Sequence, residues 1–456
     1  MSNPRSTALT FLGLTTFVLL AVPRLSLKFG SVPIYAIDAL VLVTILFARQ
    51  LQPARESKLK PMVVFILLCM LASELVAGIR MRTLLEPVYI IIRIGLAASL
   101  FFLAPRIIRN HDDLEYILKA ALLGILVTAA LLISTSIPQL RGVVTQYIFT
   151  LEFLEPSSVE RFFLSSETAI RGRSLVGVSI LSGAFLNTFW PLTFLLRRSP
   201  GLTRFWKLAL VASTILTPIA VVLTYSRGAV LGLFFATIAA LFINSGKIRR
   251  AVILGVGLAA LVFSLVGWDS DLFFFERLET TTETFVENPL DEVSEQERIF
   301  AYTEPFQHLV AHPEFLLIGQ GFARWKVAGS HLTEGENAAT HAVFAAAYYG
   351  YGLLAAFAYL ALIFQAYRLT WWHIVYSNDP KSFSSTYSRA LLAGLAGFTS
   401  WFILGHAGVS EPRGAMVLFL IFGLAAVQNN FAFVAEEAPG GWEPAAQPRL
   451  TGEPWQ

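Results

Sequence analysis

An arginine stands at the start of an apolar run in the stretch TYSRGAVLGL, where Arg227 follows Ser226. Serine is a favoured N-cap residue, so we expect a helix to begin here with Arg227 in its first turn. That terminus presents free N–H groups and the positive end of the helix dipole, which disfavour a cation unless an anion joins it. Arginine binds phosphate oxygens bidentately. Arg227 is therefore predicted to hold a phosphate or diphosphate, the alternative being an anchor that reaches lipid headgroups.

Three further apolar runs carry cationic or imidazole side chains at the same kind of position. They are Arg171 and Arg173 before the run near residue 177, His341 before the run near residue 342, and His406 and Arg413 around the start of the run near residue 413. This recurrence predicts an anion-binding vestibule on one side of a membrane.

His341 is the candidate for proton chemistry. A helix N-terminus disfavours the imidazolium, which lowers the pKa of a histidine there and favours its neutral form. A neutral imidazole beside an acceptor hydroxyl can act as a general base. The alternative, a histidine that only caps its helix at the interface, stays open from the residues alone.

Acidic and histidine pairs give weaker grounds for a metal site. Asp269 and Asp271, in WDSD, have Asp-x-Asp spacing, but so short a motif also fits a polar turn that ends a helix. His308 and His312 lie at i and i+4, yet Pro313 follows at once and no third ligand is apparent. We therefore expect no metal and no other cofactor.

The elements that position these residues are membrane helices. Hydrophobic residues make up 55% of the chain and charged residues 14%, a composition that excludes an ordinary soluble domain and gives no reason to expect a nucleic-acid partner. Apolar runs of bilayer-spanning length recur, and each must be helical because unpaired backbone groups cannot face lipid. About twelve runs are predicted, near residues 8–22, 31–48, 61–79, 84–104, 114–137, 177–196, 206–224, 228–244, 251–268, 342–369, 388–408 and 413–433.

Lysine and arginine set the orientation of these spans. With the N-terminus in the cytoplasm, most of them fall in the even-numbered connections, and the short odd connections carry few. Both termini are then cytoplasmic, and two long segments lie outside. The predicted organisation is spans one to five in 1–137, a periplasmic segment at 138–176, spans six to nine in 177–268, a larger periplasmic segment at 269–341, spans ten to twelve in 342–433, and a disordered cytoplasmic tail at 434–456.

Four charged residues fall inside predicted spans and need partners there: Asp38, Glu74, Glu86 and Arg93. Glu86 and Arg93 are seven residues apart, on one helix face, which predicts a polar network that joins packed helices. Charges inside a membrane can also line a conduction path. A secondary transporter of an anionic solute is therefore the rival from another functional class, although no internal repeat is evident.

Three stretches resemble the O-antigen ligase family, which also includes O-antigen polymerases. TYSRGAVLGL is similar to the family's Ser-Arg-Gly-Ala stretch. SEQERIFAYTEPFQHLVAHPEFLLIGQGFARW is similar to its Glu-Arg helix and Gly-x-Gly segment, which gives Arg298, Gly319 and Gly321. THAVFAAAYYGYGLLA resembles its histidine before a glycine-rich helix, with His341 and Gly352 at the family's spacing.

Two positions depart from the family's pattern, since Ala342 stands where asparagine is usual and Ala355 replaces a later glycine. The resemblance implies an all-α polytopic membrane protein of GT-C-like fold in the bacterial inner membrane, with its active site facing the periplasm. It implies metal-independent transfer of a glycan from undecaprenyl diphosphate to a sugar hydroxyl, such as that of lipid A-core. A polymerase that joins lipid-linked repeat units is the alternative within the family.

The resemblance also assigns roles to particular side chains. Arg227, Arg298 and Arg173 would hold the diphosphate, and His341 would orient or deprotonate the acceptor. Further contacts on the outer face are expected from Arg171, Arg324, His406 and Arg413.

Overall fold

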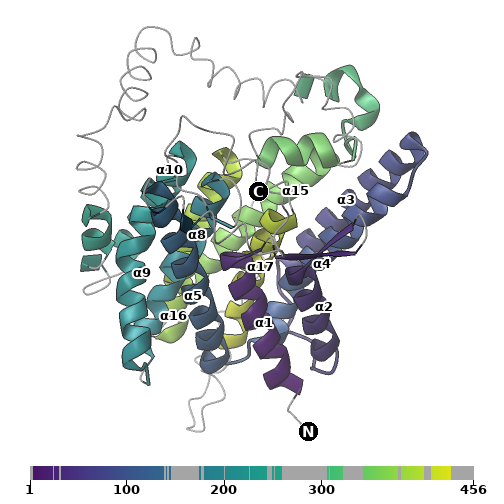
Figure 1. Ribbon diagram of the computed structural model, residues 1–456. Helices are drawn as coiled ribbons and strands as arrows, with labels where there is room; N and C mark the ends of the chain where they lie inside the picture. The colour runs from purple at the N-terminus through teal and green to yellow at the C-terminus, as the bar shows by residue number, and fades with distance from the viewer. Residues whose placement is uncertain are drawn as a thin grey trace, which may run out of the picture.

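The computed structural model is a bundle of long helices (Figure 1). It describes residues 4–23, 25–29, 32–137, 140, 143–144, 174–175, 179–199, 201–224, 226–243, 249–250, 252–258, 306–307, 309–321, 343–377, 382–404 and 412–432. The elements, in chain order, are α1 (Pro4–Ala21), β1 (Ser26–Phe29), β2 (Val32–Tyr35), α2 (Ala36–Ala48), α3 (Lys60–Met81), α4 (Leu85–Ile107), α5 (His111–Ser136), α8 (Ser179–Thr193), η1 (Phe194–Arg198), α9 (Arg204–Val222), α10 (Arg227–Ile243), η2 (Pro313–Phe315), α15 (Val343–Val375), α16 (Phe383–Leu404) and α17 (Pro412–Ala432).

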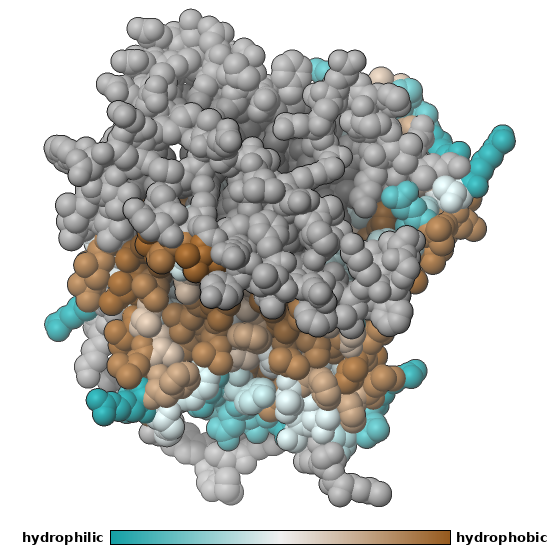
Figure 2. All heavy atoms as spheres, viewed as in Figure 1, coloured by the Kyte–Doolittle hydropathy of each residue, from teal (hydrophilic) through white to brown (hydrophobic). Residues whose placement is uncertain are grey.

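Seven of the described helices are long and apolar enough to cross a bilayer: α1, α3, α4, α5, α9, α15 and α17. α2 and α10 are apolar but shorter. The surface agrees with a membrane setting, because a belt of hydrophobic residues crosses the molecule above a rim of hydrophilic ones (Figure 2). The chain is thus an α-helical polytopic membrane protein, while the count of twelve spans and the GT-C-like fold stay predictions.

The second predicted span differs from the structure at its beginning. The run was expected to be helical from residue 31, but residues 32–35 form β2, which pairs antiparallel with β1. Proline in a helix interior removes a backbone hydrogen bond and clashes with the preceding turn, and valine and isoleucine favour extended backbone. Val32, Pro33 and Ile34 therefore suit a short strand better than a helix. The helix α2 starts only at Ala36.

Close approach of helices holds the bundle together. α17 is almost wholly enclosed and packs on α4 and α16. A Cβ at Gly423 of α17 would lie 2.9 Å from the carbonyl oxygen of Leu100 in α4, so the missing side chain lets the two backbones touch. Such small-residue contacts are typical of membrane helices, which gain from packing rather than from exclusion of water.

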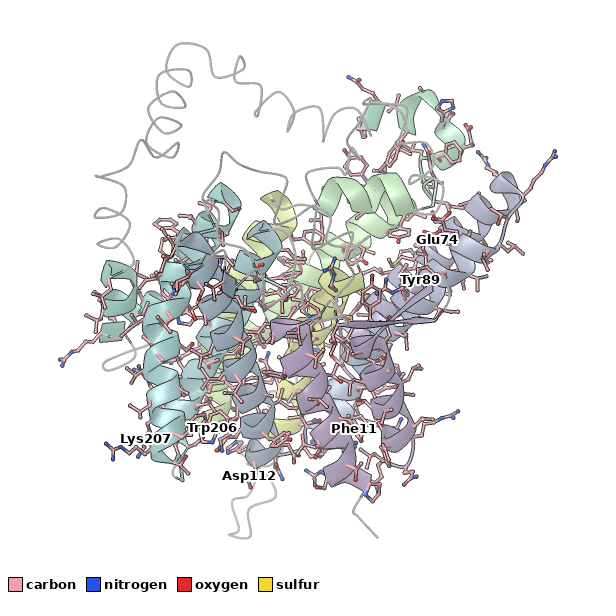
Figure 3. The ribbon with its side chains drawn as sticks, viewed as in Figure 1. Phe11, Glu74, Tyr89, Asp112, Trp206 and Lys207 are labelled. Carbon is pink, nitrogen blue, oxygen red and sulfur yellow. The ribbon has the colours of Figure 1, made fainter. Side chains whose placement is uncertain are left out.

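The connections predicted to be cytoplasmic meet at one end of the bundle. Arg109, between α4 and α5, donates to the carbonyl oxygen of Gln52 over 2.7 Å, which joins it to the connection after α2. Asn430, near the end of α17, donates to the carbonyl oxygen of Pro105 over 2.8 Å. Asp112 and Lys207 lie at this same end (Figure 3). These segments therefore lie at one end of the bundle, and the predicted topology and the side of the membrane that this end faces stay predictions.

Candidate active site

Arg227 is the first residue of α10, as the sequence predicts. Ser226 caps the helix: its Oγ accepts from the N–H of Ala229 at 3.4 Å, and its carbonyl oxygen accepts from the N–H of Val230 at 3.0 Å. The N–H of Ser226 in turn donates to Oγ1 of Thr224 over 3.2 Å. The chain between α9 and α10 is thus fixed by its own hydroxyl groups, and the start of α10 has one defined position.

A neighbouring helix fixes the same first turn. Asn187 of α8 is buried and donates from Nδ2 to the carbonyl oxygen of Ala229 over 2.7 Å. Gly183, one turn earlier on α8, leaves no room for a Cβ beside the Cβ of Ala229. An amide side chain and a close helix contact therefore hold the residues next to Arg227 against α8.

Four helix starts that the sequence singles out lie toward the end of the bundle opposite Asp112 and Lys207 (Figures 1 and 3). They are the first turns of α8, α10, α15 and α17. Arg413 is the second residue of α17. α15 begins two residues after His341, and Ser174, next to Arg173, is buried with its Oγ 2.8 Å from the Oγ of Ser182 in α8. The other predicted site residues lie outside the described residues: Arg171, Arg173, Asp269, Asp271, Arg298, Arg324, His341 and His406.

A break in α15 is the best-defined feature near these helix starts. Gly352 has φ 82° and ψ 172°, which divides α15 into an outer half at 343–351 and an inner half at 353–375. The segment Leu316–Gly321 lies along the break. The N–H of Gly321 donates to Gly350 O over 2.8 Å, the N–H of Gln320 to Tyr349 O over 3.2 Å, and the N–H of Leu353 to Leu316 O over 2.9 Å.

Glycine is required where these two segments meet. A Cβ at Gly352 would overlap the carbonyl oxygen of Leu317, and a Cβ at Gly321 would overlap the Cβ of Ala77 in α3. Gly319, Gly321 and Gly352 are the glycines with positive φ among the described residues, at 81°, 77° and 82°. L-residues rarely adopt such angles, so side chains are excluded both by backbone conformation and by space. The glycines of the family resemblance are thus the ones that form the α15 break.

α3 completes the site from the other side. Ser73 donates from Oγ to Gly350 O over 2.6 Å, so the same carbonyl that receives Gly321 is also bonded to α3. Glu74, the next residue, is fully buried, and its Oε2 lies 3.5 Å from the position of a Cβ on Gly321. Figure 3 shows Glu74 on α3, at the opposite end of the molecule from Asp112 and Lys207. From the sequence alone Glu74 is only a charge in a span, because its neighbours in the structure come from segments some 240 residues away or more.

The outer end of α3 contacts the same segment through Arg80. Its guanidinium carbon lies 4.1 Å from the ring centre of Phe315, and its Nη1 lies 3.9 Å from Oε1 of Glu314. His312 also faces Glu314, with 3.7 Å between Nδ1 and Oε1. Among the described residues no group of three or more metal-ligating side chains comes together.

Two of the intramembrane charges, Asp38 and Arg93, form an ion pair that joins two packed helices. Arg93 of α4 lies with its Nε 3.5 Å from Oδ2 of Asp38 in α2, and both side chains are largely buried. It also donates from Nη1 to the hydroxyl of Tyr89 over 3.2 Å and stands 4.5 Å from the ring centre of Tyr35. Among the described side chains Arg93 thus pairs with Asp38 rather than with Glu86.

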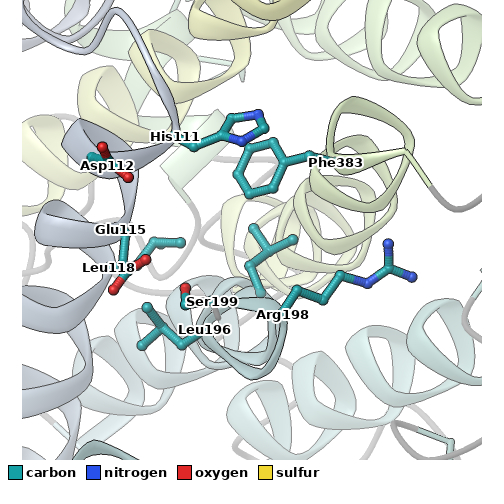
Figure 4. A pocket seen from close by; sticks show the side chains of 9 residues that line it. His111, Asp112, Glu115, Leu118, Leu196, Arg198, Ser199 and Phe383 are labelled. Atoms are coloured by element: carbon teal, nitrogen blue, oxygen red, sulfur yellow. The ribbon is translucent and has the colours of Figure 1, made fainter. Parts of the chain in front are cut away.

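A pocket lies at the other end of the bundle. It is a cavity of about 180 Å³ beside His111, whose ring centre is 3.5 Å from that of Phe383 (Figure 4). Acidic and basic side chains line it together, among them Asp112, Glu115 and Arg198. Because it lies far from the starts of α8, α10, α15 and α17, it is not part of the candidate active site.

Comparison with known proteins agrees with the resemblance found in the sequence. Residues 210–360 match the family model described as O-antigen ligase. The match includes Arg227 and the three glycines of the α15 break. No curated protein matches the chain. Over residues 210–360, the chain is therefore similar to the O-antigen ligase family.

Proposed function

We propose that this protein transfers a glycan from undecaprenyl diphosphate to a sugar hydroxyl, without a metal, at the end of the bundle where α8, α10, α15 and α17 begin. The family supports a membrane glycosyltransferase of ligase or polymerase type. The observation that carries the finer proposal is the fixed start of α10, where a serine cap and Asn187 hold the residues beside Arg227 in place.

The reaction needs positive charge at the leaving group. The acceptor oxygen bonds to the anomeric carbon, the bond from that carbon to the diphosphate oxygen breaks, and undecaprenyl diphosphate leaves with the electron pair. Fixed cationic donors stabilise charge that develops in the transition state, in a place where water is excluded. Arg227 is proposed to supply such charge together with Arg298 and Arg173, and a guanidinium matches phosphate oxygens with two parallel hydrogen bonds.

The acceptor hydroxyl must lose its proton as the new bond forms. We assign this role to His341, which precedes α15 by two residues, as general base or as the group that orients the hydroxyl. Arg171, Arg324, His406 and Arg413 are proposed as further contacts to the charged substrates. The periplasmic position of the site in the bacterial inner membrane is part of the same proposal.

The pairing of intramembrane charges favours a transferase over a transporter. Asp38 and Arg93 neutralise each other between α2 and α4, and Glu74 is enclosed by α3 and the segment before the α15 break. Charges that line a conduction path must instead face an aqueous cavity.

Transfer by the purified protein tests the proposal. The protein in lipid vesicles is supplied with a synthetic undecaprenyl-diphosphate glycan and, separately, with lipid A-core oligosaccharide or a second lipid-linked repeat as acceptor. Product on lipid A-core identifies a ligase, and extension of the lipid-linked repeat identifies a polymerase. Absence of product with both acceptors, together with uptake of an anionic sugar into vesicles, would refute the proposal in favour of transport.

A further inference from the structure

Two consecutive polar residues interrupt an otherwise apolar stretch of α3, ILLCMLASELVAGI. These are Ser73 and Glu74, and both are fully buried. Ser73 donates to Gly350 O, directly at the break in α15. Glu74 lies beside Gly321, with its Oε2 3.5 Å from the position of a Cβ on that glycine. The polar part of α3 is therefore directed at the break rather than spread over the helix.

Burial of a carboxyl group at this position is energetically unfavourable. Enclosing a charged or polar group destabilises the fold unless its hydrogen bonds are satisfied, and an apolar side chain of the same size often gives equal or greater stability. Helix packing alone would be served by leucine. The presence of Glu74 thus points to a role in fixing a particular arrangement of the segments around it.

The arrangement that Glu74 touches determines the direction of the outer half of α15. At the break the helix continuity is lost, so residues 343–351 are held at their inner end by the bonds from Gln320, Gly321 and Ser73. Gly321 is packed between these bonds and the α3 backbone, with the position of its Cβ 2.9 Å from Ser73 O. A shift of Gly321 would be passed to Gly350 and so to the outer half-helix, which begins two residues after His341.

We propose that Glu74 is a positioning residue for the glycan transfer: its buried carboxyl sets how Leu316–Gly321 lies against the α15 break, and thereby the orientation of the half-helix that follows His341. The expected effect on turnover rests on the proposed function. It predicts that replacement of this buried polar side chain by an apolar one lowers turnover, while binding of the diphosphate, which is assigned to arginines elsewhere, is little changed.

Three variants test this inference. Glu74→Leu keeps the volume and removes the polar group, Glu74→Gln keeps the shape and most of the hydrogen bonding, and Glu314→Gln makes the same change at an exposed carboxylate of the same segment. A misplacement of about 1 Å costs on the order of 100-fold in rate. We expect Glu74→Leu to lower kcat by about 10- to 100-fold with the donor KM within about twofold of wild type, and Glu74→Gln and Glu314→Gln to keep most of the activity.

Hydrogen exchange provides a readout that needs no substrate. In Glu74→Leu the amides of Gln320, Gly321 and Leu353 should exchange faster, because their bonds across the break loosen, while amides of α17 stay protected. Hydrogen exchange therefore tests whether Glu74 holds the segment at the break, even if the wild-type protein transfers no glycan. A failure of transfer in the wild-type protein would count against the proposed function alone.

Several outcomes would overturn the inference. They are a Glu74→Leu protein with wild-type turnover, an unchanged exchange pattern across the break, and an equal loss of turnover in Glu74→Gln. Failure of Glu74→Leu to accumulate as folded protein would also overturn it, since the residue would then serve stability rather than position.

Discussion

The N–H of Gly321 donates to the carbonyl oxygen of Gly350 over 2.8 Å, which joins the segment before the described part of α15 to the break inside that helix. Both residues lie in the stretch that matches the O-antigen ligase model. The bond is possible because no side chain stands between the two backbones. It makes the break a fixed feature, since a free carbonyl in a membrane helix would otherwise lack a partner.

Substitution at the break should destabilise the protein. Gly352→Ala would place a methyl group against the carbonyl oxygen of Leu317, at a φ of 82° that disfavours any side chain. Such backbone strain alone costs about 1–3 kcal/mol, and the overlap adds to it. We expect a lower thermal unfolding midpoint in detergent. Gly95→Ala in α4 is the control, because its Cβ meets open space and alanine favours a helix; an equal midpoint for both variants would show that the break tolerates a side chain.

The pair formed by Asp38 and Arg93 should behave as a buried ion pair. Arg93→Leu leaves Asp38 enclosed without its cation, a change that typically costs about 3–5 kcal/mol. Adding Asp38→Leu should recover most of the lost stability, because neither charge is then stranded. Unfolding midpoints of the two single variants and the double variant measure the coupling. Glu86→Gln should have little effect, and a larger loss in this variant than in Arg93→Leu would contradict the assignment of the ion pair to Asp38 and Arg93.

Removal of the Arg227 guanidinium should abolish glycan transfer without loss of folded protein. Arg227→Lys should recover little, because an ammonium group lacks the two-pronged geometry of arginine. Arg368→Ala, an exposed arginine at the far end of α15, is the matched control and should keep wild-type turnover. Steady-state transfer rates at saturating donor separate the variants. Near-normal transfer by Arg227→Ala would leave Arg227 as an anchor at the membrane interface.

The length of the apolar runs predicted most of the helices, but not the features that depend on distant partners. α1, α3, α4, α5, α9 and α17 appear close to their predicted ranges because about 20 apolar residues in a bilayer have few alternatives to a helix. Pro33 carried a local signal for the hairpin, and it was outweighed by the hydrophobicity around it.

The candidate site could be predicted from the sequence only in part, for the same reason. Ser226 and Arg227 could be placed from adjacent residues, because a cap is a local structure. The break at Gly352 could not, because the glycine is explained by Leu317 and Gly321 from another segment. Glu74 and Asp38 likewise gain their meaning from partners on other helices, which no spacing within one span reveals.

Chelation of metal ions and substitution of His341 together separate base catalysis from metal catalysis. If arginines neutralise the departing diphosphate, transfer should persist in excess EDTA, and Asp269→Ala and Asp271→Ala should be mild. His341→Ala should instead lower turnover by about 10²- to 10⁴-fold, the usual contribution of a positioned acid–base group. A general base works in its neutral form, so the rate should rise with pH while the imidazolium loses its proton and level off above that range; His341→Ala should lose this dependence. Activity that falls in EDTA and returns with Mg²⁺ or Mn²⁺, with His341→Ala unaffected, would move the chemistry to Asp269 and Asp271. For the comparison to hold, the unfolding midpoints measured without substrate must be equal in the wild type and the three variants.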